Sequence, residues 1–175
     1  MEAEKQERFA MYVRNFVFGV EDSLVSTVGL LSGIASVGVE RGTIVLTGVI
    51  LIFVEALSMA VGSYLSEFSA EEYMKHTEMS FKHPFIGGII MFFSYFFAGF
   101  IPLFPYVLAE RPVAFTLSII ASLVALFLLG VASAKTVRRP FMRSAFRMLL
   151  LGGVAIAVGV IVGGFMKASG LIPHP

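Results

Sequence analysis

Five apolar segments, each long enough to cross a lipid bilayer, constrain the fold of this chain more than any other feature. A membrane-spanning helix needs about 20 mostly apolar residues, and such segments lie near residues 15–37, 44–66, 85–108, 112–134 and 146–166. Charged residues make up only 14% of the chain, whereas soluble domains are about 25% charged. The sequence therefore predicts an all-α integral membrane protein, with residues 1–175 forming a single transmembrane domain.

The distribution of basic residues predicts the orientation of these spans, because cytoplasmic loops of membrane proteins carry an excess of Lys and Arg. If the N-terminus is cytoplasmic, ten of the 13 Lys and Arg residues lie on the cytoplasmic side, and only Arg41, Arg111 and Lys167 lie outside. We therefore expect a cytoplasmic N-terminus and, after five spans, a C-terminus outside. The N-terminal segment does not resemble a cleaved signal peptide, so the first span is expected to be retained.

Composition and motifs argue against several classes of function. The chain has no cysteine, so thiolate metal ligands and disulfides are excluded. It shows no basic cluster typical of a nucleic-acid surface and no phosphate-binding or hydrolase motif. No Glu-x-x-His pair of the kind that holds metals in helical oxidases lies within a span. We expect a protein that is not an enzyme, carries no cofactor and binds no nucleic acid.

Three carboxylates lie within the predicted spans: Glu21, Asp22 and Glu55. A charge at the centre of a span costs at least about 2.5–3.5 kcal/mol, so each is a candidate functional residue. Counting a rise of about 1.5 Å per residue from the cytoplasmic ends places Asp22 and Met59 at similar depth. Glu55 lies one turn deeper, on the same helix face as Met59. Asp22, Glu55 and Met59 are therefore predicted to form a polar cluster between the first and second spans.

The residue types in this cluster favour metal transport. Carboxylates bind divalent cations, and a thioether favours transition metals over Mg²⁺ or Ca²⁺. Desolvated carboxylates also bind protons more readily, so the cluster could carry metal one way and protons the other. Alternatives are a helix-packing hydrogen bond or an ion pair with Arg14 for Asp22, a hydrogen bond from protonated Glu55, and ordinary packing of Met59. Glu21 points about 100° away from Asp22 and is not expected to share its site.

The polar segment 67–83 is predicted to prolong the second span as a cytosolic helix. Its Glu67, Glu71 and Glu72 are candidate ligands where a metal ion would enter. The alternative is a solvated acidic face, although Glu72 and His76 also have the i, i+4 spacing that permits chelation.

Two sequence blocks resemble the helix signatures of the vacuolar iron transporter (VIT) family. The first runs from Phe18 to Gly33 as FGVEDSLVSTVGLLSG, and the second from Glu55 to Ser66 as EALSMAVGSYLS. His83-Pro84 before the third span and IPLFPY over 101–106 extend the resemblance across nearly the whole chain.

This resemblance implies a proton-coupled exporter of cytosolic Fe²⁺, with Mn²⁺ as a second substrate, in the cell membrane of a prokaryote or a vacuolar-type membrane of a eukaryote. It implies a homodimer with the pathway at the subunit interface, lined by the first and second spans. By resemblance, Asp22 and Met59 match the acidic and thioether positions of that pathway. Close contact between two copies of the first span would explain Gly29 and Gly33, whereas Gly159-x-x-x-Gly163 is expected to pack within the chain.

The sequence departs from the plant type of this family in two ways. A large cytosolic metal-binding domain normally separates the second and third spans, and only the link 67–83 is present here. The family's Gly-Glu-Tyr at the end of the second span is Gly62-Ser63-Tyr64, while an acid appears deeper at Glu55. The alternative function is a non-transporting membrane scaffold or sensor, in which the acids within the spans only hold helices together.

Overall fold

The structure, a computed structural model, describes residues 2–75, 81–137 and 141–170 of the 175-residue chain. The described residues form five helices: α1 (Glu2–Ser36), α2 (Arg41–Lys75), α3 (Lys82–Leu108), α4 (Arg111–Val137) and α5 (Phe141–Ala168). All five are long and apolar enough to cross a membrane. The predicted all-α fold is confirmed, and each predicted span lies within one helix except for Val37, which follows α1.

Helix α2 continues through the polar segment as far as Lys75, so the predicted prolongation is confirmed over residues 67–75 and wrong for Lys82 and His83, which belong to α3. The sequence from Ser66 to Lys75 contains neither Gly nor Pro, so nothing in it interrupts the hydrogen-bond ladder of the helix. Helix α3 begins at Lys82, so residues 76–81 alone connect the two helices. This connection is too short for a separate metal-binding domain.

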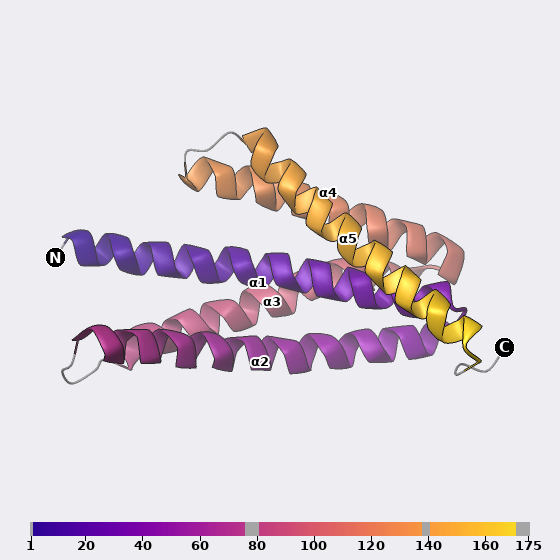
Figure 1. Ribbon diagram of the computed structural model, residues 1–175, viewed down its shortest axis with the longest axis horizontal. Helices are drawn as coiled ribbons and strands as arrows, with labels where there is room; N and C mark the ends of the chain where they lie inside the picture. Colours follow the sequence, from indigo (N-terminus) through magenta and orange to yellow (C-terminus); the bar gives the residue numbers. More distant parts are fainter. Residues whose placement is uncertain (1, 76–80, 138–140, 171–175) are drawn as a thin grey trace.

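The helices run up and down the long axis of the molecule, with α1 and α3 at its centre (Figure 1). Helix α3 packs against α1, α2 and α4, and α1 also contacts α5. The starts of α1, α3 and α5 lie at the same end as the ends of α2 and α4, and we call this the N-terminal end of the bundle. Toward it, α4 and α5 diverge from α1.

Glycines bring the backbones of α1 and α5 into direct contact. A Cβ atom on Gly33 would lie 2.7 Å from the carbonyl oxygen of Gly159, and one on Gly163 would overlap the carbonyl oxygen of Gly33. The prediction that Gly159 and Gly163 pack within the chain is confirmed. The prediction that Gly29 and Gly33 form a subunit contact is wrong, because their small surfaces are covered by α5 of the same chain.

Buried hydroxyl groups hold α3 against its neighbours. The Ser23 hydroxyl on α1 donates a hydrogen bond of 2.7 Å to the Tyr95 carbonyl oxygen. The Ser118 hydroxyl on α4 donates one of the same length to the carbonyl oxygen of Pro102. Pro102 and Pro105 lack backbone N–H groups, yet α3 continues through both to Leu108. Helix α3 is thereby fixed between α1 and α4, which positions its side chains for the site below.

Candidate functional site

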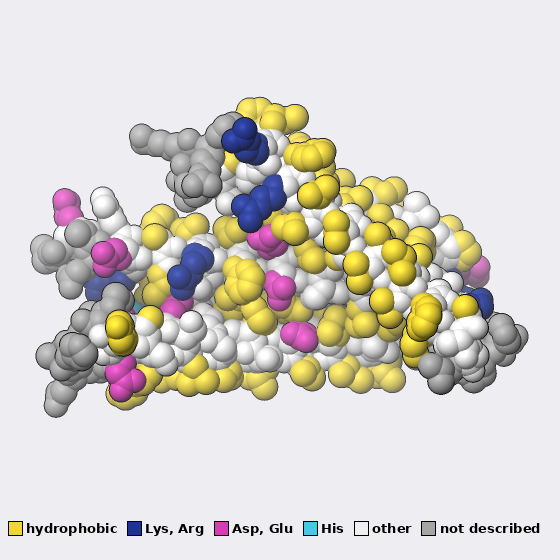
Figure 2. Space-filling model, in the orientation of Figure 1, with side chains coloured by type: hydrophobic (Ala, Val, Ile, Leu, Met, Phe, Trp, Pro, Cys, Tyr) yellow, Lys and Arg dark blue, Asp and Glu magenta, His cyan; other side chains and the backbone are white. Residues whose placement is uncertain are grey.

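Asp22 on α1 and Glu55 on α2 lie close to each other, and both are half-buried. Each is near enough for its charge to act on the other and on the hydroxyl group of Tyr95. Figure 2 shows acidic side chains midway along the molecule, over the face that α1 and α2 form. The fold therefore brings two carboxylates from different helices to the middle of one face.

Neither carboxylate is engaged by the rest of the chain. Within the described residues, Asp22 and Glu55 accept no side-chain hydrogen bond and form no ion pair. The Arg14 alternative is wrong for Asp22, because the Arg14 guanidinium instead donates a hydrogen bond of 3.2 Å to Oε1 of Glu67. Since unpaired charges are costly among apolar helices, these two carboxylates need a cation, protons or water.

Tyr95 is a polar neighbour that the sequence analysis missed. Its ring is fully buried, and its hydroxyl lies 2.7 Å from the hydroxyl of Ser26. Nothing in the aromatic run around Tyr95 distinguishes it from its apolar neighbours. Only the packing of α3 on α1 places its hydroxyl beside the carboxylates.

A stripe of polar and sulfur-containing side chains winds along α2 at intervals of four residues: Glu55, Met59, Ser63, Glu67 and Glu71. Four residues exceed one helical turn by about 40°, so the stripe rotates around the helix. Its members accordingly differ in burial: Glu55 and Met59 are half-buried, and Glu67 is 6% exposed. The stripe leads from the face of Asp22 into the interior toward the N-terminal end of the bundle.

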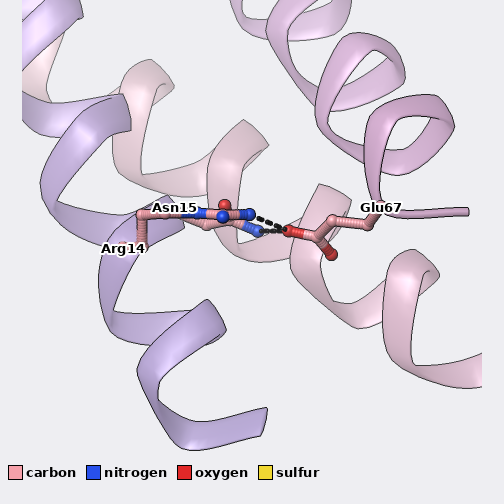
Figure 3. Close-up of polar contacts among 3 residues, drawn as sticks. All are labelled: Arg14, Asn15 and Glu67. Atoms are coloured by element: carbon pink, nitrogen blue, oxygen red, sulfur yellow. Dashed lines mark hydrogen bonds and ion pairs between the residues drawn. The ribbon is translucent and has the colours of Figure 1, made fainter. Parts of the chain in front are cut away.

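Glu67 is held by two side chains of α1, as Figure 3 shows. Its Oε1 atom accepts hydrogen bonds from Nδ2 of Asn15 at 2.6 Å and from Arg14. Its Oε2 atom is buried without a hydrogen-bond partner. The carboxylate fits because Gly87 on α3 has no side chain, and a Cβ there would overlap Oε2. The alternative of a solvated acidic face is therefore wrong for Glu67.

A cavity of about 480 Å³ lies beside Glu67, between α1, α2 and α3. Arg14 and Asn15 line it from α1, Met59 and Ser63 from α2, and Met91 from α3. It reaches the surface, because the lining residue Arg14 is exposed.

Two lining residues connect this cavity with the acidic pair. Phe18 and Met59 lie in its wall, and each is four residues from one of the two acids, since Phe18 precedes Asp22 and Met59 follows Glu55. Residues four apart lie on the same helix face, so Asp22 and Glu55 continue the same seam between α1 and α2.

The remaining candidates lie at other places on the surface. Glu71 is half-buried and Glu72 exposed, both near the N-terminal end of the bundle, while His76 lies outside the described residues. Glu21 lines a separate cavity of about 520 Å³ between α1 and α4. It lies near enough to Arg147 on α5 for the two charges to interact. In the described part of one chain, no group of three or more His, Cys, Asp or Glu residues could hold a metal ion.

Comparison with known proteins finds relatives over most of the chain. The model of the VIT family matches residues 13–83 and 68–164, which include every predicted ligand. The chain is 27% identical to vacuolar iron transporter homolog 4 of Arabidopsis thaliana, over 97% of this chain and 92% of the relative. It is 26% identical to homolog 3 of the same plant, over 99% and 94%. It is 22% identical to the vacuolar iron transporter of Plasmodium berghei (strain Anka), over 90% and 83%.

Proposed function

The chain belongs to the VIT family, and we propose that it exports a divalent transition-metal ion, Fe²⁺ or Mn²⁺, from the cytosol in exchange for protons. It is a multi-pass membrane protein whose relatives are named as transporters rather than enzymes. The observation that carries the proposal is the pair Asp22 and Glu55, two half-buried carboxylates on α1 and α2 that lie near enough for their charges to interact and have no partner in the described chain.

The ion follows the seam between α1 and α2. Glu71 and Glu72 attract it at the N-terminal end of the bundle, which the excess of Lys and Arg places in the cytoplasm. It then passes Glu67 and loses most of its water to Met59, Asp22 and Glu55. Carboxylate oxygens replace the water, and the thioether favours a transition metal. Protons compete with the metal for the carboxylates, and this competition couples the two flows.

A second copy of the chain completes the pathway. Ser58, Gly62 and Ser66 are small, exposed and four residues apart on α2, and a Cβ on Gly62 would meet nothing within 4 Å. Small residues at this spacing allow two helices to approach closely in a membrane. A two-fold axis beside α2 would double the Asp22, Glu55 and Met59 set. The homodimer thus supplies the multi-ligand site that one chain does not hold.

The same observation weighs against the alternative of a membrane scaffold or sensor. Carboxylates that only hold helices together should be hydrogen-bonded inside the bundle, because an unpaired buried group is destabilising. Glu67 fits that description through Asn15 and Arg14. Asp22 and Glu55 do not.

Metal uptake into proteoliposomes that contain a pH dye tests this proposal. We expect wild-type protein to take up Fe²⁺ and Mn²⁺ but not Mg²⁺, with protons moving in the opposite direction. Asp22→Asn should abolish uptake and leave the protein folded, because an amide neither binds the metal nor releases a proton. Glu40→Gln is the matched control, since Glu40 is an exposed acid in the turn between α1 and α2, and it should transport normally.

Two results would contradict the proposal. Normal uptake by Asp22→Asn would remove Asp22 from the pathway and end this mechanism. A folded wild-type protein that moves no metal would favour the scaffold.

A further inference from the structure

We propose that the cavity between α1, α2 and α3 is a binding site for one divalent transition-metal ion, with Glu67, Met59 and Met91 as ligands. The site rests on the proposed function, because it loads the ion before the ion reaches Asp22 and Glu55. It shares Met59 with the pathway but differs from the acidic pair in position and in chemistry, since it lies inside one chain and contains two sulfur atoms.

Two oxygen atoms beside this cavity lack the partners that buried oxygens normally have. Glu67 is 6% exposed, and its Oε2 atom has no hydrogen-bond partner. The Ser63 hydroxyl, one turn earlier on α2, is also buried without a partner. Leaving a buried polar group unpaired costs about 1–3 kcal/mol, and more for a charged group. Oε2 lies over Gly87, and a turn of the carboxylate from Gly87 toward the cavity would let a cation there remove this cost, with the Ser63 hydroxyl as a further ligand.

The two methionines determine which cations suit the site. Met59 and Met91 line the cavity from α2 and α3. Met91 is 2% exposed, and its sulfur is held close to α1, where a Cβ on Gly19 would lie 3.1 Å from it. Thioethers favour softer transition metals over Mg²⁺ and Ca²⁺. One carboxylate with two thioethers therefore favours a transition-metal ion over Mg²⁺ and Ca²⁺ before the ion reaches the more oxygen-rich pair.

Arg14 competes with the metal for Glu67. Its guanidinium forms an ion pair of 3.2 Å with Oε1, although its side chain is 67% exposed. Only the Glu67 end of this pair is buried, so the arginine can swing into solvent when a metal ion takes over the charge of Glu67. Asn15 keeps its hydrogen bond to Glu67 and holds the carboxylate in place. Arg14 is thus a tethered cation that the arriving ion displaces.

Calorimetric titration of the purified full chain with Co²⁺, an air-stable stand-in for Fe²⁺, tests this site. The titration is performed with and without Asp22→Asn, so that binding at the acidic pair is recognised. Loss of a metal's outer-shell partner costs about 10–100-fold in affinity, so loss of a ligand in Met91→Leu should weaken Co²⁺ binding at least about tenfold. Met148→Leu is the matched control, since Met148 is a buried methionine on α5 outside this cavity. Arg14→Gln should strengthen binding.

The outcomes separate this site from the proposed function. Equal Co²⁺ affinity in Met91→Leu and Met148→Leu would overturn the site, even if proteoliposomes transport metal. Weaker binding in Arg14→Gln would also overturn it, because Arg14 would then support the cavity rather than compete for it. Tenfold weaker binding in Met91→Leu, in a protein that transports no metal, would support the site while the proposed function fails.

Discussion

At the scale of single residues, the carboxylates of this chain lie in three different kinds of surroundings. Glu67 is buried and hydrogen-bonded to two side chains. Asp22 and Glu55 are half-buried and unpartnered within the described chain, and Glu72 is exposed. A buried charge is tolerated only with partners, whereas an exposed one needs none. In the proposed mechanism, the exposed Glu72 attracts an ion and the unpartnered Asp22 and Glu55 carry it.

The position of the Glu67 carboxylate depends on a neighbouring glycine, and this dependence can be tested. In Gly87→Ala the new Cβ would overlap Oε2 of Glu67 and lie 2.8 Å from Nδ2 of Asn15. Overpacking of this kind costs about 1–3 kcal/mol, so we expect a lower thermal unfolding midpoint in detergent. Gly153→Ala is the control, since its Cβ meets nothing within 4 Å. Equal midpoints for the two variants would show that the carboxylate does not lie over Gly87.

At the scale of helices, the contact of α1 with α5 is made by backbone atoms. A carbonyl oxygen in a helix cannot turn aside as the end of a long side chain can, so added atoms at this contact must push the helices apart. The contact therefore holds α5, whose residues are mostly exposed, against the rest of the bundle.

Two adjacent glycines on α5 provide a matched test of this contact. A Cβ in Gly163→Ala would overlap the carbonyl oxygen of Gly33, whereas one in Gly164→Ala would meet nothing within 4 Å. We expect Gly163→Ala to lose about 1–3 kcal/mol of stability and Gly164→Ala to lose little. Thermal unfolding of both variants measures the difference. Equal losses would mean that α5 does not pack on α1 through this face.

At the scale of the whole molecule, the homodimer can be tested because the chain contains no cysteine. A disulfide requires Cα atoms about 4.4–6.8 Å apart, so a cysteine near the two-fold axis should cross-link and one far from it should not. We expect oxidation in membranes to convert Ser58→Cys on α2 into covalent dimers. Val158→Cys, at an exposed position on α5, should remain monomeric on gels. Cross-linking only of Val158→Cys would place the subunit contact on α5 and refute a pathway between two copies of α2.

The sequence by itself determined the helices and the local arrangement of residues along each of them. Membrane thickness sets the length of an apolar segment, so the five helices and their order could be predicted. The absence of Gly and Pro from Ser66 to Lys75 predicted the extension of α2. Helical periodicity placed Glu55 and Met59 on one face, because residues four apart always share a face.

Only the tertiary structure decided which helix each face meets. It gave Gly33 a partner on α5, turned Arg14 toward Glu67, and buried Tyr95 near Asp22 and Met91 in the wall of the cavity beside Glu67. None of these contacts follows from periodicity. Lipid tails and neighbouring helices are both apolar, so the same apolar helix face can contact either of them. Contacts between helices depend instead on fitting small residues and on pairing the few polar groups, and both require the assembled bundle.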